Sequence, residues 1–473
     1  MVFNSIAFLI FFPLVYIIYW LFKNKNVVYQ NSILLIASYI FYGWWDWRFL
    51  SLIGISTIID YLVGIKISEA RTKKLKKYYL LISIFVNLGL LGFFKYYNFF
   101  ISSFRESLQS LGFEFDTWTL NIILPIGISF YTFQTLSYSI DIYKGKIKPT
   151  KDFISFSVFV SFFPQLVAGP IERAKHLLPQ FINRRKFIYE DAIFGITLIS
   201  YGLFKKIVIA DRLAIYVNSV FNDIDNANTI SLTIAIIFFS FQIYADFSGY
   251  SLIARGIAKL LGFDLMINFN KPYLASSISE FWKKWHISLS TWFKDYVYIP
   301  LGGNRVTVIR NYYNIMIVFL ISGLWHGANW TFIIWGGIHG VYQIFYLIYK
   351  KYFNTKEKVS QLHKLFNILF VYLLVSFAWI FFRAKNLEVA TLYISKISCL
   401  DFSLNLVQIS ANEGPLNLFL SFSVIALLFL SYLLPENLKF KKTSYFIIFN
   451  IITVLLIIII GINGEEEFIY FQF

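Results

Sequence analysis

The sequence predicts an all-α, polytopic membrane protein, and three observations lead to that prediction. Hydrophobic residues make up 58% of the 473 positions and aromatic residues 21%, far more than the core of a soluble domain requires. Apolar stretches of about 20 residues, long enough for a helix to cross the hydrocarbon core, recur along almost the whole chain. Basic residues gather in the short segments between these stretches, as they do in cytoplasmic loops.

The net charge of +16 does not indicate nucleic-acid binding, because the Lys and Arg residues lie in short loops rather than on one basic face. Residues 66–77 (KISEARTKKLKK) carry six basic residues and one acidic residue, which predicts a cytoplasmic loop. Residues 218–229 carry two Asp and no basic residue, so we expect them outside. The single cysteine, Cys399, excludes an internal disulfide and a Cys-rich metal site.

Alternating these assignments gives about twelve crossings, with both termini on the outer side of the membrane. We expect residues 1–473 to form one integral membrane domain, because no repeat or linker interrupts the pattern. The predicted crossings lie near residues 3–22, 31–44, 49–65, 78–98, 119–141, 191–211, 232–254, 312–326, 330–349, 364–383, 416–434 and 444–463.

Two further segments do not fit as crossings. Residues 153–169 begin and end beside basic loops and contain Pro164, which favours a re-entrant segment. Residues 271–310 mix Trp, Lys and His with apolar residues, which is typical of helices at the cytoplasmic interface. Irregular backbone at membrane depth must be buried or line a wet cavity. The two segments therefore predict a cavity that is entered from the cytoplasm.

His326 is the first candidate for chemistry, because ionisable side chains within membrane helices are costly and often functional. It lies at the outer end of a predicted crossing, in the segment GLWHGANW at 323–330, beside Trp325. An imidazole with a pKa near neutrality can accept a proton from a hydroxyl group and later return it. The alternative is a helix-end histidine within an aromatic belt.

His286 lies in the segment FWKKWHISLSTW at 281–292, where it and Trp282 would share one face of a helix. The alternative is an interfacial helix anchored by Trp and Lys. A zinc site formed by His286, His326 and His339 is weakly supported, because no HExxH motif or closely spaced ligand pair is present, and we predict no metal.

Three charged residues are candidates for the lining of a polar cavity, namely Glu172, Arg173 and Asp246. An internal salt bridge or a hydrogen bond between packed helices explains each of them at least as well. We expect His176 to lie in a solvated cytoplasmic loop.

Taken together, five ordered motifs resemble those of the membrane-bound O-acyltransferase family. The resemblance is to the branch that contains the alginate and peptidoglycan O-acetyltransferases and the D-alanyl transfer protein of teichoic acid synthesis. The motifs are LVAGPIER (166–173), YADFSGY (244–250), FWKKWHISLS (281–290), WFKDYVYIPLGGNR (292–305) and GLWHGANW (323–330).

The resemblance implies a bundle of membrane helices around a central tunnel. It implies that His326 is the catalytic histidine and that His286 is the second histidine of the active site. The stretch YIPLGGNR at 298–305 is more similar to the acetyltransferases than to the D-alanyl proteins, which implies acetyl-CoA as the donor. The residues expected to line the cavity or bind substrate are Trp325, Trp282, Trp285, Asp246, Glu172, Arg173 and Asn329.

The C-terminus, GEEEFIYFQF at 464–473, resembles the tyrosine motif of the small single-span partner in the D-alanyl transfer system. Residues 444–473 would then be that partner's helix and motif fused to this chain, with Tyr470 as a covalent acyl carrier. The alternative is an aromatic tail that anchors the last helix at the interface.

The resemblance implies an O-acetyltransferase of the bacterial inner membrane that moves acetyl groups outward to a cell-envelope polysaccharide. Peptidoglycan is the preferred acceptor polymer, and alginate or another exopolysaccharide is the alternative. We expect a periplasmic or membrane-anchored transferase as partner, besides membrane lipid. A small-solute transporter is the competing class, although no internal symmetry of paired halves is visible in the sequence.

Overall fold

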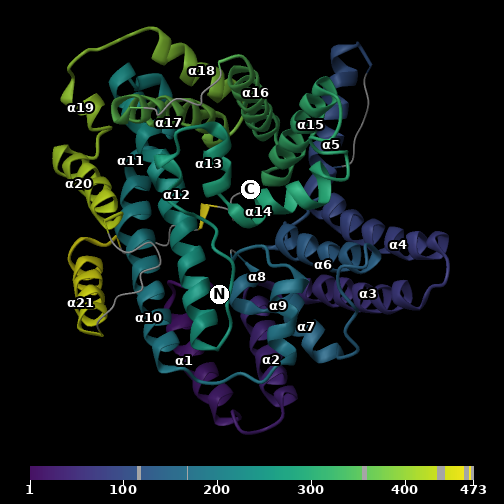
Figure 1. The fold of residues 1–473 in the computed structure, drawn as a ribbon. Coiled ribbons are helices and arrows are strands. Elements are labelled where there is room, and N and C mark those ends of the chain that lie inside the picture. The colour runs from purple at the N-terminus through teal and green to yellow at the C-terminus, as the bar shows by residue number, and fades with distance from the viewer. Residues whose placement is uncertain (114–118, 168, 354–359, 434–442, 463–467, 470–473) are drawn as a thin grey trace. The chain divides into compact units, whose positions relative to one another are not determined.

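The computed structural model describes residues 1–113, 119–167, 169–353, 360–433, 443–462 and 468–469. The chain divides into two compact units, unit 1 with residues 1–196 and 254–266, and unit 2 with residues 197–253 and 267–473. Secondary structure in the described part of the chain is helical, without strands (Figure 1). The all-α prediction is therefore confirmed, whereas the single-domain prediction stays a prediction.

Seven helical stretches among the described residues are long and apolar enough to cross a membrane, which agrees with a multi-pass membrane protein. Four shorter apolar helical stretches accompany them. The seven stretches are Val27–Glu69, Lys73–Ser110, Tyr189–Asn222, Thr229–Leu260, Val308–His326, Trp330–Tyr352 and Gln361–Arg383. The shorter ones are Ile6–Leu21, Phe153–Leu166, Pro415–Ser431 and Ser444–Ile460.

Unit 1 is built around α3, which packs against both α4 and α6, while α2 packs against α7. Its elements are α1 (Ile6–Leu21), α2 (Val27–Asp46), η1 (Trp47–Phe49), α3 (Leu50–Glu69), α4 (Lys73–Leu91), η2 (Gly92–Tyr96), α5 (Tyr97–Ser110), α6 (Ile128–Tyr143), α7 (Phe153–Ser161), α8 (Phe163–Leu166) and α9 (Ala174–Ile182). Two helices, α10 (Tyr189–Leu203) and α12 (Thr229–Leu260), contribute residues to both units.

A buried polar network joins α3, α4 and α6 inside unit 1. Asp60 is fully buried, and its carboxylate accepts hydrogen bonds from Ser83 (2.5 Å), Ser139 (2.6 Å) and the Asn87 amide (2.7 Å). Since each carboxylate oxygen has a donor, this acidic residue within a membrane helix is explained by helix packing.

The segment 153–169 forms two short helices rather than one. Asp152 caps α7 by accepting hydrogen bonds from the amides of Ile154 and Ser155. Phe162 then adopts a non-helical conformation with ψ 105°, two residues before Pro164, and α8 follows. The predicted helix break is confirmed, and the re-entrant path through the membrane stays a prediction.

Unit 2 holds the remaining elements. They are η3 (Phe204–Ala210), α11 (Asp211–Asn222), η4 (Ile224–Asn226), η5 (Pro272–Leu274), α13 (Ile278–Lys284), α14 (Ile287–Phe293), η6 (Lys294–Tyr298), α15 (Val308–His326), α16 (Trp330–Tyr352), α17 (Gln361–Arg383), α18 (Leu387–Ser398), α19 (Leu406–Ile409), α20 (Pro415–Ser431) and α21 (Thr443–Ile460). The short helices between residues 271 and 310 confirm that this stretch does not form one crossing.

The prediction that Trp282 and His286 share one face of a helix was wrong. Helix α13 ends at Lys284, and His286 takes a left-handed conformation with φ 42° before α14 begins. A left-handed residue cannot continue a right-handed helix. His286 and Trp285 are both fully buried, so this segment is not an interfacial helix that Trp and Lys simply anchor.

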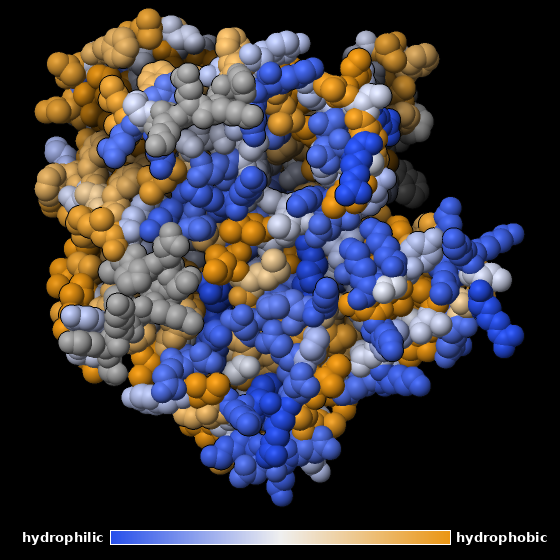
Figure 2. All heavy atoms as spheres, viewed as in Figure 1, coloured by the Kyte–Doolittle hydropathy of each residue, from blue (hydrophilic) through white to orange (hydrophobic). Residues whose placement is uncertain are grey.

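Large apolar side chains remain exposed on several membrane-type helices. On α1 they include Ile6 (79% exposed) and Leu9 (74%), and on α21 they include Ile458 (73%) and Ile459 (72%). Figure 2 shows apolar surface gathered over α20 and α21. Continuous apolar surface of this kind suits contact with lipid hydrocarbon rather than water.

Candidate active site

His326 ends α15 inside unit 2, where the backbone of α16 comes unusually close. A Cβ atom on Gly323 would lie 2.3 Å from the carbonyl oxygen of Phe332, and one on Gly336 would lie 2.3 Å from that of Phe319. Only glycine permits this approach. The crossing of α15 and α16 therefore fixes the position of the His326 backbone, and the His326 side chain is 3% exposed.

Aromatic rings surround the His326 imidazole. Its ring centroid lies 4.9 Å from that of Trp335, 5.0 Å from Trp325 and 5.4 Å from Phe382, each in an edge-to-face arrangement. The centroid of His286 lies 6.3 Å away. The structure thus brings together, in one buried aromatic cluster, two histidines that lie 40 residues apart in the sequence.

The left-handed conformation of His286 places its ring beside α12. The imidazole packs edge-to-face on Phe247 at 4.6 Å and lies 6.0 Å from Trp325. His286 lies outside the membrane-spanning helices, and burial lowers the pKa of its imidazole from 6.5 to about 3. His286 is therefore neutral at physiological pH, with one nitrogen able to donate a hydrogen bond and the other able to accept one.

His339, which the sequence left without a role, is the third buried histidine among the described residues of unit 2. It lies on α16 one turn after Trp335, is fully buried, and its ring is 5.0 Å from both Trp335 and Trp282. Trp285 packs beside this cluster, 5.1 Å from Trp379. The predicted residues Trp282, Trp285 and Trp325 thus all belong to the aromatic wall around the histidines.

Asp246 and Asn329 make definite polar contacts within unit 2. Asp246 forms an ion pair with Lys206 at 3.0 Å. Asn329 caps α16 by accepting a hydrogen bond from Thr331 N at 3.0 Å, and its amide donates to the Lys385 carbonyl at 2.8 Å. Asn329 thus holds the turn that follows His326, while contact of either residue with substrate stays a prediction.

Glu172 and Arg173 belong to unit 1, where Glu172 is completely buried. The Glu172 carboxylate lies 2.8 Å from His176 Nδ1 and accepts a hydrogen bond from Met266 N at 2.6 Å. This carboxylate raises the pKa of the His176 imidazole above 6.5. The prediction of a merely solvated His176 missed this pairing, although the spacing of four residues on α9 and its entry segment could have indicated it.

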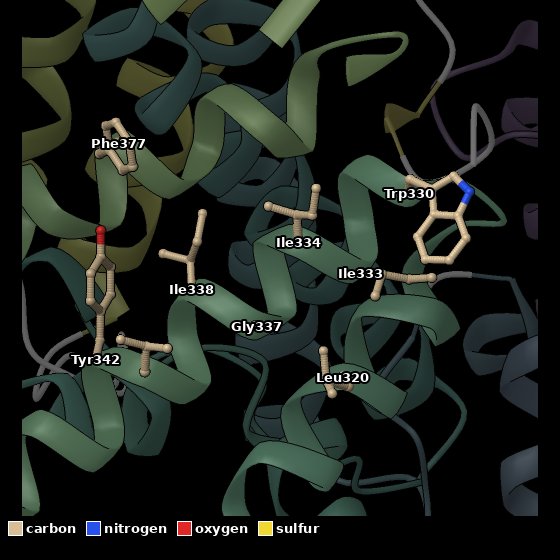
Figure 3. A pocket seen from close by; sticks show the side chains of 9 residues that line it. Leu320, Trp330, Ile333, Ile334, Gly337, Ile338, Tyr342 and Phe377 are labelled. Carbon is tan, nitrogen blue, oxygen red and sulfur yellow. The ribbon is translucent and has the colours of Figure 1, made fainter. Parts of the chain in front are cut away.

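No group of three His, Cys, Asp or Glu side chains in the described ranges is arranged to hold a metal ion. An apolar groove of about 510 Å³ lies on the exposed face of α16, and Figure 3 shows its lining. Neither His326 nor His286 contributes to this groove. The lining residues are Leu320, Trp330, Ile333, Ile334, Gly337, Ile338, Val341, Tyr342 and Phe377. Such a surface suits lipid chains and offers no charged group to a nucleotide.

Tyr470, the third predicted catalytic residue, lies outside the described residues. The two residues before it in the sequence, Phe468 and Ile469, are described and are 1% and 4% exposed. Sequence reasoning missed Lys206, whose ammonium group is buried between two carboxylates. The signal was present, because Lys205 and Lys206 lie within a predicted crossing, where a charged side chain is costly.

The apolar helices and the family match together define the class of protein, a membrane-bound acyltransferase. The model of the membrane-bound O-acyltransferase family matches residues 45–385, and the chain belongs to this family. It is therefore an acyltransferase rather than a transporter.

Several relatives are named for O-acetylation. The chain is 41% identical to the probable alginate O-acetylase AlgI of Azotobacter vinelandii, over 86% of this chain and 80% of the relative. It is 38% identical to the peptidoglycan O-acetyltransferase of Helicobacter pylori, over 82% of this chain and 78% of the relative. The teichoic acid D-alanyltransferase of Bacillus subtilis is 29% identical, over 50% of this chain and 62% of the relative.

Proposed function

We propose that this protein takes an acetyl group from acetyl-CoA at the cytoplasmic side of the bacterial inner membrane and passes it outward for O-acetylation of a cell-envelope polysaccharide. The observation that carries the proposal is the proximity of His326 and His286 in one buried aromatic cluster, with ring centroids 6.3 Å apart. Relatives named for O-acetylation match most of the chain, which supports the acetyl group as cargo.

In the proposed reaction His326 acts as the general base. Its imidazole takes the proton of an acceptor hydroxyl as the oxygen attacks the thioester carbonyl, and the C–S bond then breaks. The imidazolium returns the proton to the leaving thiolate, so the products are an acetyl ester and free CoA. His286 is neutral and can donate a hydrogen bond to the carbonyl oxygen, on which negative charge develops during attack.

The surrounding aromatic side chains exclude bulk water from this step. Trp335, Trp325 and Phe382 enclose the His326 ring. Water that reached the thioester would compete with the acceptor hydroxyl and release acetate. A dry pocket therefore favours transfer over hydrolysis.

Topology supplies the direction of transfer in this proposal. About twelve crossings with both termini in the periplasm would place the basic loops beside cytoplasmic acetyl-CoA, with a central tunnel leading to the histidines. The phosphates of CoA carry negative charge that Lys and Arg side chains can bind, while only the acetyl arm enters the tunnel.

Tyr470 is the proposed first acceptor. Its phenol would receive the acetyl group and pass the ester to a periplasmic or membrane-anchored transferase, because an aryl ester is a better acyl donor than an alkyl ester. Phe468 and Ile469, the two residues before Tyr470 in the sequence, are buried within unit 2, which supports the proposal. Peptidoglycan is the preferred polymer, and alginate or another exopolysaccharide is the alternative, since relatives are named for both.

The test uses the purified full chain in lipid nanodiscs with radiolabelled acetyl-CoA. His326→Ala should lower the rate of CoA release by about 10²- to 10⁴-fold, the usual contribution of a general base. His363→Ala is the matched control, because His363 is an exposed histidine at the start of α17. A folded His326→Ala protein with the wild-type rate would refute the role of His326. Loss of O-acetyl esters from peptidoglycan on gene deletion would identify the polymer.

A further inference from the structure

A buried ion-pair cluster lies where η3, α11 and α12 meet in unit 2. The Lys206 ammonium group lies 2.8 Å from Asp211 and 3.0 Å from Asp246, and the side chains of these residues are only 2–4% exposed. The π-helical turn of η3 directs two consecutive lysines to different partners, since Lys205 instead donates to Ser248 at 3.1 Å. Burial of charged groups is costly, so an ionisable cluster among apolar helices is a candidate functional site.

Two described residues close to the C-terminus, Phe468 and Ile469, lie against this cluster. The backbone amide of Ile469 donates a hydrogen bond of 2.7 Å to Asp246 Oδ2, while the other carboxylate oxygen of Asp246 faces Lys206. The ring of Phe468 packs 4.3 Å from Tyr250 and 5.7 Å from Phe247, both on α12. Figure 1 shows this last short segment beside α12.

The helix that leads to this segment is tied to the same region. The guanidinium group of Arg212 donates to the Ile460 carbonyl at 2.9 Å, and Ile462 N donates to the Ile207 carbonyl at 3.2 Å. Both described parts of the C-terminal stretch are therefore bonded to residues on or directly beside η3. These contacts give Phe468 and Ile469 a defined place within unit 2.

One aromatic ring connects this anchor to the catalytic pocket. Phe247 follows Asp246 on α12 and contacts Phe468 on one side and His286, at 4.6 Å, on the other. The chain end and the histidines thus lie against the same side chain. If Phe468 and Ile469 shifted, the distance between a donor thioester and the residues that follow Ile469 would change.

We propose that Asp246 and Lys206 are positioning residues that anchor the C-terminal segment beside His286, so that the chain end can receive the acyl group. This inference rests on the proposed function. Lys206 orients the Asp246 carboxylate, and this carboxylate accepts a hydrogen bond from a backbone amide. The anchor therefore positions the main chain and does not depend on which side chain residue 469 carries. Asp246 is then a partner of the chain end and not a ligand of the donor.

The first experiment measures anchoring without catalysis. Ile469→Cys in a Cys399→Ser background keeps the backbone amide and puts a single thiol at a position that is 4% exposed in the wild type. Adding Asp246→Ala should raise the rate of maleimide labelling about ten- to hundred-fold, the equivalent of losing one hydrogen bond to a charged group. Lys205→Met is the matched control and should leave labelling unchanged. Equal labelling with and without Asp246→Ala would overturn the anchor.

The second experiment measures transfer. After incubation with acetyl-CoA, mass spectrometry of the C-terminal peptide should show at least ten-fold less acetylation in Asp246→Ala. Slow hydrolysis of acetyl-CoA, which also releases CoA, should persist in this variant. Asp246→Asn, which keeps the side-chain volume and one acceptor oxygen, should give an intermediate loss and serves if the Ala variant fails to fold. Unchanged acetylation of the peptide in these variants would refute positioning. Absence of CoA release in the wild type would instead refute the proposed function and leave the labelling result to decide the anchor.

Discussion

The neutrality of buried His286 predicts a specific dependence of stability on pH. Burial lowers the pKa of this imidazole to about 3 in the folded protein, whereas an unfolded chain has a value of about 6.5. Between pH 3 and pH 6.5, the imidazole therefore binds a proton in the unfolded state but not in the folded state. The contribution of His286 to the free energy of unfolding is therefore largest above pH 6.5, and it decreases as the pH is lowered toward 3.

The size of the effect follows from the two pKa values. Lowering the pH from 7.5 to 5.0 protonates the unfolded but not the folded imidazole, which costs about 1.4 kcal/mol per unit below 6.5, or about 2 kcal/mol. His176 acts in the opposite direction, because Glu172 raises its pKa and the folded protein gains from its protonation. The Met1 amino group, whose pKa burial lowers to about 6, adds a loss of its own.

A comparison with His286→Phe isolates the histidine. Phenylalanine fits among the neighbouring rings of Phe247 and Phe269 but cannot titrate. Thermal unfolding of the detergent-solubilised proteins would be followed by intrinsic tryptophan fluorescence at pH 7.5 and 5.0. Wild type should lose about 2 kcal/mol more than the variant between these pH values. Parallel losses would show that the folded protein takes up the proton at His286 and that the imidazole is not held neutral.

Three further predictions concern packing and the carrier. Gly323→Ala should destabilise the protein by about 1–3 kcal/mol or more, because the new methyl group would meet the Phe332 carbonyl oxygen at 2.3 Å; an unchanged unfolding midpoint would contradict this close approach. His339→Ala should cost about 2–5 kcal/mol through the cavity that it leaves in the aromatic cluster, and His339→Phe much less; equal midpoints for the two variants would argue against a packing role. Tyr470→Phe keeps the ring and removes the hydroxyl, so polysaccharide acetylation in cells should be lost while membrane insertion is retained; wild-type acetylation would reject the carrier.

The membrane-type helices were the part of the fold that the sequence predicted well. The crossing expected near residues 330–349 corresponds to α16 (Trp330–Tyr352), and that near 364–383 to α17 (Gln361–Arg383). Long apolar runs bounded by polar caps carry enough information for this, since both period and length are constrained by the bilayer.

The local backbone at the site could not be predicted in the same way. The sequence around His286 fits an amphipathic helix, and no pattern in it predicts that His286 adopts a left-handed backbone conformation. That conformation is maintained by tertiary contacts, among them the fully buried Trp285 and the packing of His286 on Phe247. Local propensity is a weak guide where the surrounding structure determines a strained conformation.

The sequence also could not predict which charged residues form ion pairs with one another. Asp246 was noticed because a carboxylate in an apolar helix is costly, but its partner Lys206 is 40 residues earlier in the chain. Only the packing of helices can show which of several charged residues meet. Glu172 and His176 are the contrasting case, since these partners lie only four residues apart in the sequence.

The glycine contact between α15 and α16 makes the position of the His326 backbone independent of the size of the side chains that surround its ring. Gly323 and Gly336 bring main chains together, so the location of His326 depends on backbone contact more than on the bulky rings around it. If the proposed function holds, those rings set the size of the acyl group that fits, and Trp335 is the nearest at 4.9 Å. On that proposal, substitutions of the surrounding rings would change the acyl length that is accepted while the backbone contact keeps His326 in place.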